Sequence, residues 1–476
     1  MKVLLTVHAF LPRHYHGTER YTFHIAQSLQ SMDCDVVVLT VGDHLDDSTG
    51  DLLTEYLYEG IRVIAVNARL VGGSRFRRSY ERPELNGIFR QILQKEEPDL
   101  LHSCHLLNLG ATIIDLAKEA KLPVVCSLTD FFGICSTMRL TTRRGKPCDG
   151  PSSNGVDCIA DVYNHALIGI PGRVGNVLRL LGQLAPDFFW MAFEKWANSS
   201  LGRILKLPIE DIRLRKQRLF EYYRQVDVFL TTSDCVRDMC VAHGLPAERF
   251  VIIPPGVTQP NPLEMVALEK RYADLKSGSP LIFGFIGQVA RHKGVDLLVK
   301  AFQHAELPHA ELHIYGDLNQ EWETGKCLLA ASKANPRIKC LGTFDGREIY
   351  QKLSFIHILC VPSQWHENAP LVLLNGLASK TFLIVSQAKG LVEFVQDGIS
   401  GFVFEMSGLE SLTLALRQAY ERRDGLAERF RTLPGYKVTP ADYGWQVYRI
   451  YDELLNNYRC ATRWRSPVGQ SSSDSE

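Results

Sequence analysis

The sequence lacks an excess of either charge. Its 476 residues contain 53 Lys and Arg against 53 Asp and Glu, which gives a formal net charge of zero. A protein dedicated to DNA or RNA usually carries a clear basic excess, because contacts to phosphate groups supply much of its affinity. No nucleic-acid partner is therefore expected, although a local basic patch is compatible with a balanced total.

The sequence also lacks a long hydrophobic run. No stretch reaches the roughly 20 apolar residues of a transmembrane helix. The apolar start, MKVLLTVHAF, is too short for a signal peptide, and it is followed by Pro12, Arg13 and His14 instead of a small-residue cleavage site. These absences predict a cytoplasmic protein whose first residues form a strand.

A C-x2-C pair, which zinc sites often include, is missing from the one cluster of cysteines. Most of the 12 cysteines are scattered, and several lie in apolar runs, which fits reduced thiols in a protein core. Cys135, Cys148 and Cys158 share one loop, with Asp161 at the place of a fourth cysteine. Ordinary thiols are the preferred interpretation and a structural metal the alternative, so no metal site is expected.

The length and the pattern of apolar residues predict two α/β domains. The chain is about three times the usual size of one domain. Apolar runs alternate with helical patterns in two series, which favours parallel, doubly wound sheets that bind ligands at the carboxyl ends of their strands. The expected strands are Lys2–Val7, Asp35–Thr40, Ile61–Val66, Asp99–His102, Pro123–Thr129, Val226–Ser233 and Val251–Pro254, then Leu281–Ile286, Glu311–Tyr315, Ile338–Leu341, Ile356–Val361, Thr381–Val385 and Gly401–Phe404.

Interruptions of this alternation define the expected domain boundaries. The four prolines of PPGVTQPNP indicate a stiff linker. A helical insert that becomes basic toward its end is compatible with a membrane surface, but a cap on the first domain with a solvated basic face is preferred. The predicted parts are a first domain over 1–257 with the insert at about 162–223, a linker over 258–278, a second domain over 279–440, a final helix over 441–460 and a disordered tail over 461–476.

The stretch FGFIGQVARHKGVDLLVKAF has the composition of a diphosphate-binding loop. Gly284, Gly287 and Gly294 permit a tight turn, and the helix expected from Val295 offers free backbone N–H groups and a positive dipole end. Lys293 adds a full positive charge beside that end. The spacing alone leaves a surface lysine before an ordinary helix as the other interpretation.

The stretch VPSQWHENAPLVLLNGLA places Glu367 in a loop between a strand that ends at Val361 and a helix that starts near Pro370. Glu367 is a candidate for accepting hydrogen bonds from sugar hydroxyls. Asn375 lies about two helical turns further on and can reach the same side. The alternative is a carboxylate that only complements the helix dipole.

Two loops of the first domain are weaker candidates. Gly17, in HGTE, precedes a helix expected from Arg20 and offers a second backbone site for an anion, whereas Glu19 is explained by the charge of the helix N-terminus. Asp130, in SLTDFFG, follows a strand, where catalytic groups often lie. It also suits the cap of the next segment.

In their order and separation these motifs resemble those of the retaining glycosyltransferases of family four, which have the GT-B fold. The likeness is strongest over PSQWHENAPLVLLNGLASKTFLIVSQAKGLVEFVQDGISGFVF, which is similar to the family's donor-site stretch. It extends through FIGQVARHKGVDLLVKAF, HGTERYTFHIAQSL and VDVFLTTSDCVRDMCVAHGLPAERFVIIPPGV, and so covers the chain to about Tyr458. The resemblance implies two Rossmann-like domains facing a cleft, with the final helix packing back toward the first domain.

The resemblance also implies roles for the candidates, without a cofactor or a metal. A nucleotide sugar is the expected donor, and a glycan or lipid-linked molecule is the expected acceptor, with peripheral membrane contact left open. The catalytic candidates are Asp130, Lys293 and Glu367, the donor-binding candidates are Gly17, Gln288, Lys293, Glu367, Asn368, Ala369, Pro370, Leu371 and Asn375, and the acceptor-side candidates are His102, His105 and Asp130.

Three positions depart from the family's pattern. Asn375 replaces the second glutamate of E-x7-E, Gln288 replaces an arginine beside the diphosphate lysine, and Thr129 replaces a histidine. Neutral side chains make weaker hydrogen bonds to a charged donor. The resemblance implies a metal-independent, hexosyl-type, retaining transferase of polysaccharide or cell-envelope synthesis, and the three departures leave a noncatalytic or weakly active relative as the alternative. The order of the donor motifs disfavours an epimerase or a phosphorylase.

Overall fold

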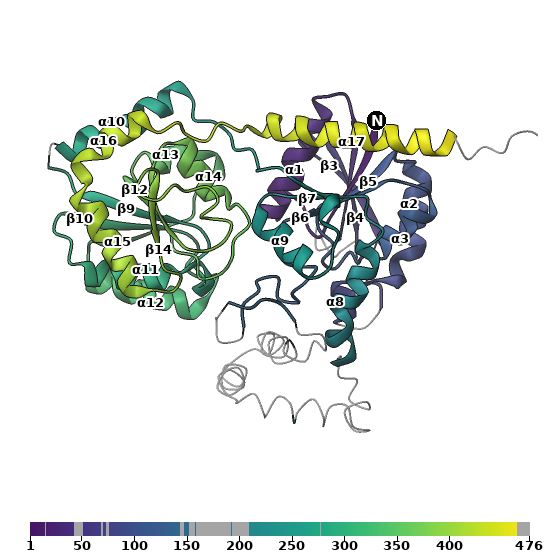
Figure 1. Cartoon of the computed structure of the whole chain (residues 1–476), viewed down its shortest axis with the longest axis horizontal. Coiled ribbons are helices and arrows are strands. Elements are labelled where there is room, and N and C mark those ends of the chain that lie inside the picture. Colours follow the sequence, from purple (N-terminus) through teal and green to yellow (C-terminus); the bar gives the residue numbers. More distant parts are fainter. Residues whose placement is uncertain are drawn as a thin grey trace, which may run out of the picture.

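The computed structural model describes residues 1–14, 16–41, 51–67, 70–72, 76–142, 147–151, 158, 192, 209–276 and 278–463. Most of the expected insert, together with Asp161 and the end of the tail, lies outside these residues. The described chain forms two lobes, each built around its own sheet, as Figure 1 shows.

The first lobe contains a sheet with the strand order β3-β4-β2-β1-β5-β6-β7-β8. Every pairing is parallel except the one between β3 and β4. The strands are β1 (Lys2–Val7), β2 (Asp35–Val41), β3 (Leu53–Tyr58), β4 (Ile61–Val66), β5 (Leu100–Ser103), β6 (Val124–Leu128), β7 (Val228–Thr231) and β8 (Phe250–Ile252). Strand β3 was not expected, because it lies at the sheet edge, alternates exposed and half-buried residues and has no continuous apolar run.

Helices cover both faces of this sheet and bury two apolar clusters. One cluster takes residues from α2, α3, α8 and α9, and the other takes residues from α1 and the last helix of the chain. The helices are α1 (Gly17–Gln30), α2 (Asn86–Glu96), α3 (Thr112–Glu119), α8 (Ile209–Tyr223) and α9 (Asp234–Ala242). The doubly wound architecture expected for this half is confirmed.

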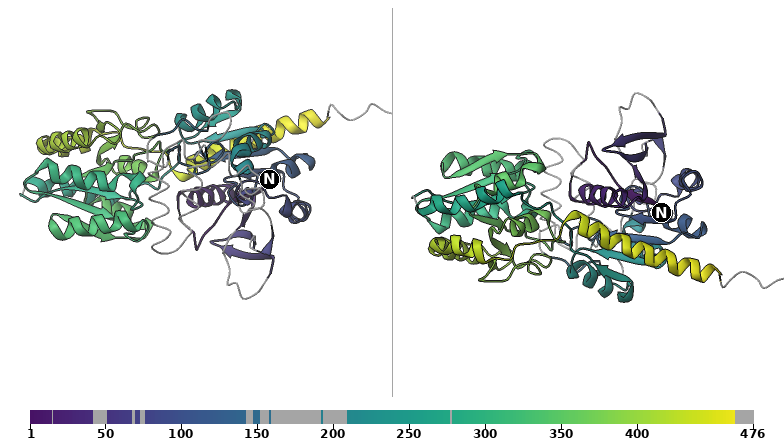
Figure 2. Two further views of the ribbon diagram at one scale, coloured as in Figure 1. Left: turned by 90° about the horizontal axis from the view of Figure 1, so that it is seen from below. Right: turned by 90° about the horizontal axis from the view of Figure 1, so that it is seen from above.

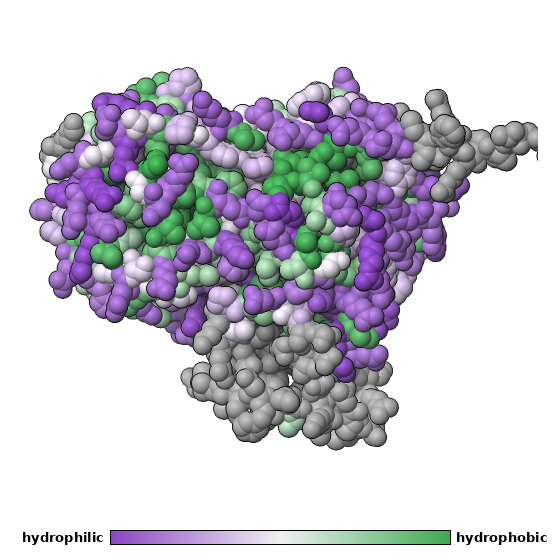
Figure 3. Space-filling view, in the orientation of Figure 1, coloured by the Kyte–Doolittle hydropathy of each residue, from purple (hydrophilic) through white to green (hydrophobic). Residues whose placement is uncertain are grey.

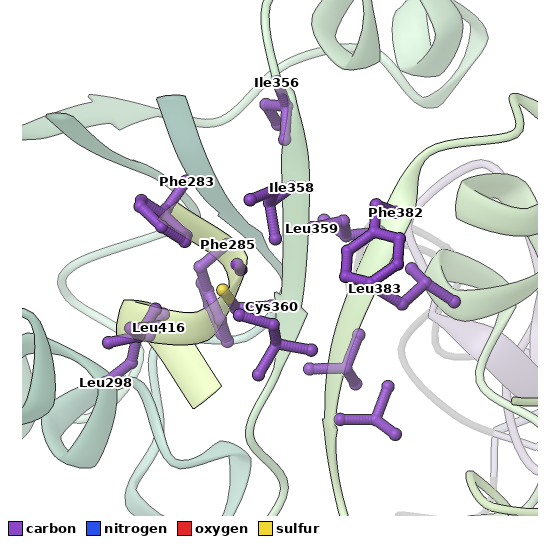
Figure 4. Close-up of a cluster of buried hydrophobic side chains, with 14 of the residues drawn as sticks. Phe283, Phe285, Leu298, Ile356, Ile358, Leu359, Cys360, Phe382, Leu383 and Leu416 are labelled. Atoms are coloured by element: carbon purple, nitrogen blue, oxygen red, sulfur yellow. The ribbon is translucent and has the colours of Figure 1, made fainter. Parts of the chain in front are cut away.

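The second lobe contains an all-parallel sheet with the order β11-β10-β9-β12-β13-β14. Its core packs side chains of β9, β12 and β13 against those of α11 and α15, as the close-up in Figure 4 shows. The strands are β9 (Leu281–Ile286), β10 (Ala310–Tyr315), β11 (Ile338–Gly342), β12 (Ile358–Val361), β13 (Phe382–Ser386) and β14 (Gly401–Phe404); the helices are α10 (Pro262–Lys276), α11 (Val295–Ala305), α12 (Trp322–Ala334), α13 (Ile349–Leu353), α14 (Leu371–Ala378), α15 (Leu409–Glu421) and α16 (Leu426–Thr432).

The segment expected to be a linker over 258–278 is mostly helix α10, so that boundary is wrong. Leu268 and Tyr272, four residues apart, are buried in the core of the second lobe, and the guanidinium of Arg271 donates to the carbonyl of Leu353. A helix that buries Leu268 and Tyr272 gains more from packing on the second core than an extended linker does. The actual crossing between the lobes ends before Pro262.

The chain crosses back to the first lobe through helix α17 (Pro440–Arg463), which lies along that lobe beside α1 (Figures 1 and 2). Tyr443, Val447 and Tyr451 recur every four residues and are buried in the core that α1 also lines. The two crossings touch, since a Cβ added to Gly256 would lie 2.0 Å from the carbonyl oxygen of Thr439. The expected return of the final helix is confirmed.

None of the described helices has the length and apolar character needed to cross a membrane. On the face that Figure 3 shows, apolar patches on both lobes are surrounded by hydrophilic residues.

Candidate functional site

A cavity of about 150 Å³ lies between the two lobes. The first lobe contributes Gly17 and Thr18 at the start of α1, and Thr129 after strand β6. The second lobe contributes the loop from Asn368 to Pro370, together with Leu371, the first residue of α14. The structure therefore brings together Gly17, the family-divergent Thr129 and four of the expected donor-binding positions.

Lys293 is positioned by a close approach of two loops of the second lobe. It ends a short 3-10 helix, Arg291–Lys293, and Gly294 follows with φ of 72°, a left-handed conformation that favours glycine. A Cβ at Gly294 would lie 1.8 Å from the carbonyl oxygen of Pro362, so the loops after β9 and β12 meet only with glycine there. Gly284, which was assigned to the turn, instead lies within β9 and makes room for Ile356.

Glu367 is 4% exposed and is held by three donors on one oxygen. Its Oε1 accepts from the Nζ of Lys293 at 2.7 Å, the Oγ of Ser363 at 2.5 Å and the Nε1 of Trp365 at 2.8 Å. The ammonium of Lys293 also lies 4.9 Å from the centre of the Trp365 ring. The buried carboxylate of Glu367 thus forms an ion pair with the half-buried Lys293, a contact that a charge at a helix N-terminus does not need.

The backbone around Glu367 is strained and tightly packed. Ala369 is buried and adopts φ of 47°, an uncommon conformation for a residue with a Cβ. The amide of Glu367 donates to the carbonyl of Lys389 at 3.0 Å, and a Cβ at Gly390 would lie 1.9 Å from the carbonyl oxygen of Glu367. Strained conformations of this kind concentrate at functional sites, which marks the loop as a candidate by a second route.

The side chain of Asn368 joins the two lobes. Its Oδ1 accepts from the hydroxyls of Thr232 at 2.6 Å and Ser233 at 2.8 Å, and its Nδ2 donates to the carbonyl of Leu128 at 3.1 Å. Sequence reasoning expected only the backbone of Asn368 to act. The contact was missed because a short polar side chain carries no signal of its partner across a domain boundary.

A carboxylate of the second lobe reinforces this contact. Glu393 accepts from the backbone N–H groups of Asp234 at 2.9 Å and Cys235 at 3.0 Å, at the start of α9 in the first lobe. A carboxylate at a helix N-terminus is favoured by the free N–H groups and by the helix dipole.

Asn375 and Gln288 do not line the cavity. The Oδ1 of Asn375 lies 3.2 Å from the hydroxyl of Tyr350, which is itself buried and in contact with the carbonyl of Thr258. Gln288 is half-buried in the loop after β9, where its carbonyl accepts from the amide of Ala290 at 2.9 Å. Lys293 and Glu367 do not line the cavity either, so the cavity does not separate the substituted donor positions from the retained ones.

On the first lobe, four ionisable groups form a row at the carboxyl edge of the sheet. The Nε2 of His105 lies 3.1 Å from a carboxylate oxygen of Asp130, and the rings of His105 and His8 are 4.6 Å apart. His8 in turn lies 3.4 Å from a carboxylate oxygen of Glu19. The sequence analysis identified His105 and Asp130 as candidates but missed His8. It assigned Glu19 only the role of balancing the positive N-terminus of the helix. His8 directly follows β1, so the strand-end rule applied to it as well.

The sequence analysis named His102 as an acceptor-side candidate, but the structure places it in the core of the first lobe. Its side chain is 0% exposed and lies under α17, where Nδ1 contacts the hydroxyl of Tyr451 and Nε2 lies 2.7 Å from the hydroxyl of Ser127. Burial lowers the pKa of His102 to about 3, which keeps the imidazole neutral. Because β5 alternates its faces, His102 points into the core while His105, beyond the strand end, reaches the edge.

Within the described ranges, no group of three or more His, Cys, Asp or Glu side chains could hold a metal ion. Of the cysteine loop, Cys135 is buried and Cys148 and Cys158 are half-buried, and all three are free thiols. The fourth position, Asp161, lies outside the described residues.

Two family models match the chain, one on each lobe. The model described as Glycosyl transferase 4-like domain matches residues 16–166, and the model described as Glycosyl transferases group 1 matches residues 268–432. Among curated proteins, the chain is 27% identical over 203 residues to the glycogen synthase of Francisella tularensis subsp. novicida and 26% identical over 202 residues to that of Francisella philomiragia. Each match spans 40% of this chain and 41% of the relative, so the chain spans about two fifths of the relatives' length.

Solved structures resemble the whole arrangement. HepE from Anabaena in complex with UDP superposes with a TM-score of 0.60 at 14% identity, covering 95% of this chain and 100% of that one. Sucrose-phosphate synthase from Thermosynechococcus elongatus gives 0.59 at 16%, covering 96% and 99%. The catalytic domain of starch synthase IV from Arabidopsis thaliana, bound to ADP and acarbose, gives 0.58 at 12%, covering 96% and 99%. At these identities the likeness establishes the GT-B fold.

Proposed function

Because the chain is a glycosyltransferase of group 1 with the GT-B fold, we propose that it transfers a hexosyl unit from a nucleoside diphosphate sugar to a glycan or lipid-linked acceptor, with retention of configuration. The observation that carries the proposal is the buried pair of Lys293 and Glu367, held beside the loop that lines the interlobe cavity. A cation and a carboxylate in contact supply one group for a diphosphate and one for sugar hydroxyls.

In this proposal Lys293 stabilises the leaving group. Breaking the bond between the anomeric carbon and phosphate leaves negative charge on the diphosphate. The ammonium of Lys293 and the free N–H groups at the start of α11, two residues further on, present positive charge where that negative charge grows. No bound metal or cofactor is needed for this stabilisation, so we propose a metal-independent reaction.

Glu367 orients the donor sugar. Three donors on Oε1 fix the carboxylate, so it is preorganised to accept hydrogen bonds from sugar hydroxyls. The loop of Ala369 and Pro370, which faces the cavity, lines the sugar and phosphate. Gly17 lies on the opposite wall, where the absence of a side chain lets backbone approach the donor.

The acceptor binds at the carboxyl edge of the first sheet, beside Asp130 and His105. Thr129 supports this placement, because it lines both the interlobe cavity and a smaller space of about 10 Å³ that His105 and Asp130 also line. Acceptor and donor regions therefore adjoin at Thr129. Asp130, which is partly exposed and held by His105, is positioned to orient an acceptor hydroxyl.

The similarities favour a polysaccharide or cell-envelope glycan as product. Curated relatives are glycogen synthases, and several of the similar structures contain UDP, UDP-glucose or ADP. We therefore rank uridine and adenosine diphosphate sugars first among donors.

A second candidate is a relative that binds a nucleotide sugar or a glycan without turnover. Asn375 beside Tyr350 and the neutral Gln288 favour it, since both replace charged groups of the family pattern. Retained Lys293 and Glu367 favour the transferase.

The test measures thermal stability of the purified protein with UDP, ADP, GDP, CDP and their common sugars. A ligand at 100 times its Kd adds about 2.7 kcal/mol to the stability of the folded state. The proposal expects stabilisation by one nucleotide family, lost in Lys293→Ala and Glu367→Ala but kept in Lys300→Ala, an exposed lysine of α11. Release of the nucleoside diphosphate from the matching sugar then separates the transferase from the binding protein, and NMR of the product anomer tests retention. Absence of any stabilisation at millimolar nucleotide would exclude the transferase in favour of a relative that binds only a glycan.

A further inference from the structure

Charge is distributed unevenly around the interlobe cavity. Of the described residues that line it, Arg20, in the first turn of α1, is the one with a full charge, and none is an aspartate or a glutamate. His24, one turn further along α1, lines the same cavity, but burial and the charge of Arg20 lower its pKa, so its imidazole is neutral at pH 7. A cation without a carboxylate around it favours an anionic occupant of the cavity.

The fold of the first lobe directs Arg20 toward the second lobe. Gly17, Arg20 and His24 follow one another at the three- and four-residue spacing of a single helix face, and all three line the cavity. Another side of α1 buries Ile25 and Leu29 in the core of the first lobe. Because that core fixes the rotation of α1, Arg20 is held at the boundary between the lobes.

The guanidinium of Arg20 reaches the second lobe at Gly346, the first residue of the 3-10 helix Gly346–Glu348 that follows β11. A Cβ added to Gly346 would lie 2.1 Å from Nη2 and 2.4 Å from Nη1 of Arg20, and its three nearest atoms all belong to this guanidinium. Gly346 does not adopt left-handed backbone, so what it contributes is space for the guanidinium. The two terminal nitrogens lie against a CH2 group, which accepts no hydrogen bond.

The guanidinium of Arg20 has unused hydrogen-bonding capacity. Within the described parts of the chain, no hydrogen bond or ion pair joins its side chain to another residue. The carboxylate of Asp345, next to Gly346, is engaged by Arg347, whose amide donates to Oδ1 at 2.9 Å and whose guanidinium donates to Oδ2 at 2.6 Å. A guanidinium gains most from an anion that takes two of its N–H groups at once.

We propose that Arg20, held against Gly346, binds a phosphate group of the nucleotide donor from the first lobe. This inference rests on the proposed function, since it concerns the same donor. The loop of Ala369 and Pro370, proposed to line the sugar and phosphate, forms the opposite wall of the cavity that Arg20 lines. The phosphates are the negatively charged part of a nucleoside diphosphate, so they are the group that this cation selects. The diphosphate is then held between Lys293 on one lobe and Arg20 on the other.

The test measures the Kd of a nucleoside diphosphate by calorimetry at two ionic strengths. The probe is whichever of UDP, ADP, GDP and CDP stabilises the unaltered protein, and the Debye length falls from about 30 Å at about 0.01 M salt to about 10 Å at about 0.1 M. The variants are Arg20→Gln, Arg20→Lys, Gly346→Ala and the double variant Arg20→Gln/Gly346→Ala. The controls are Arg90→Gln, at an exposed arginine of α2, and Gly425→Ala, at a glycine in open space.

Arg20→Gln is expected to raise the Kd about ten- to one hundred-fold, as the loss of a charge-assisted hydrogen bond does, and to weaken the dependence of the Kd on salt. Arg20→Lys should raise the Kd less and keep the salt dependence, because the charge remains while the planar pair of donors is lost. A merely structural role of Arg20 would leave the salt dependence of nucleotide binding unchanged.

Gly346→Ala tests the placement of the guanidinium without removing its charge. The added methyl group displaces the end of Arg20, so the Kd should rise roughly three- to ten-fold. In the double variant the methyl group should add less than about two-fold to the effect of Arg20→Gln, because the shorter glutamine does not reach Gly346. The two controls should bind like the unaltered protein.

No loss of affinity in Arg20→Gln, an unchanged salt dependence in that variant, or additive losses in the double variant would each overturn the proposal. In all three cases Lys293→Ala still abolishes diphosphate binding if the proposed function holds. If no nucleoside diphosphate binds the unaltered protein, the proposed function itself fails, and this inference with it. Thermal melting without ligand shows whether each variant is folded, and Arg20→Lys remains informative if Arg20→Gln is not.

Discussion

The pair of Lys293 and Glu367 makes a quantitative prediction about the protein without ligand. Lys293→Met keeps much of the side chain over Trp365 but removes the one full positive charge among the three donors on Glu367. A buried charge that loses its partner destabilises a protein by about 3–5 kcal/mol. Because the side chain of Lys293 is 22% exposed and water screens part of the interaction, we expect a loss of about 2–3 kcal/mol in the free energy of unfolding.

Adding Glu367→Gln to Lys293→Met should recover most of this loss, because a neutral amide does not need a cation. Urea unfolding of the wild type, both single variants and the double variant gives the coupling free energy of the pair, expected at about 1.5–3 kcal/mol. The double variant should be stable yet fail to bind a nucleoside diphosphate, which separates the structural pair from its role toward the donor. Lys300→Met is the matched control on α11. A coupling below about 0.5 kcal/mol would refute the reasoning that burial makes this pair strong.

Three further predictions follow from single contacts. Gly294→Ala should lower the melting temperature and abolish nucleotide stabilisation, since its Cβ would lie 1.8 Å from the carbonyl of Pro362; Gly425→Ala, in open space, should do neither. Asn368→Ala should increase the radius of gyration in small-angle scattering, because it removes hydrogen bonds between the lobes. An unchanged radius would show that these hydrogen bonds do not hold the lobes together. His102 has a pKa of about 3 folded against about 6.5 unfolded, so the unfolded state binds more protons between these values and stability is lost as pH falls from 6.5 toward 3. His102→Gln should show a smaller fall in unfolding free energy over that window, and an equal fall would contradict the assignment.

The elements that the sequence could predict are those whose signal is local. Strands β1, β4, β9 and β14 begin and end at the expected residues, because buried parallel strands are short apolar runs. Lys293 and Glu367 could be proposed because each lies in the loop between a strand and a helix. Gly294 could be singled out as glycine, but its contact with Pro362 joins loops far apart in the chain and has no local signature.

The parts that the sequence could not predict depend on tertiary packing. The prolines before α10 suggested a linker, yet the burial of Leu268 and Tyr272 decides that the segment belongs to the second core. His102 and His105 look equivalent in the sequence, and only the strand end between them places one under α17 and the other beside Asp130. Asn368 shows the same limit across the interlobe boundary, since its three partners lie in the other lobe: Leu128 in β6, and Thr232 and Ser233 just after β7.

The positions that depart from the family pattern leave fewer charged groups on both sides of the cleft. Gln288 is neutral, and the ammonium of Lys293 is already paired with Glu367 at 2.7 Å. Thr129 places a hydroxyl, and not an imidazole, at the wall opposite the donor loop, where it lies 3.2 Å from the hydroxyl of Thr18. With fewer charged groups to hold a donor, an active enzyme with these substitutions should depend strongly on contact between its lobes, through Asn368 and Glu393.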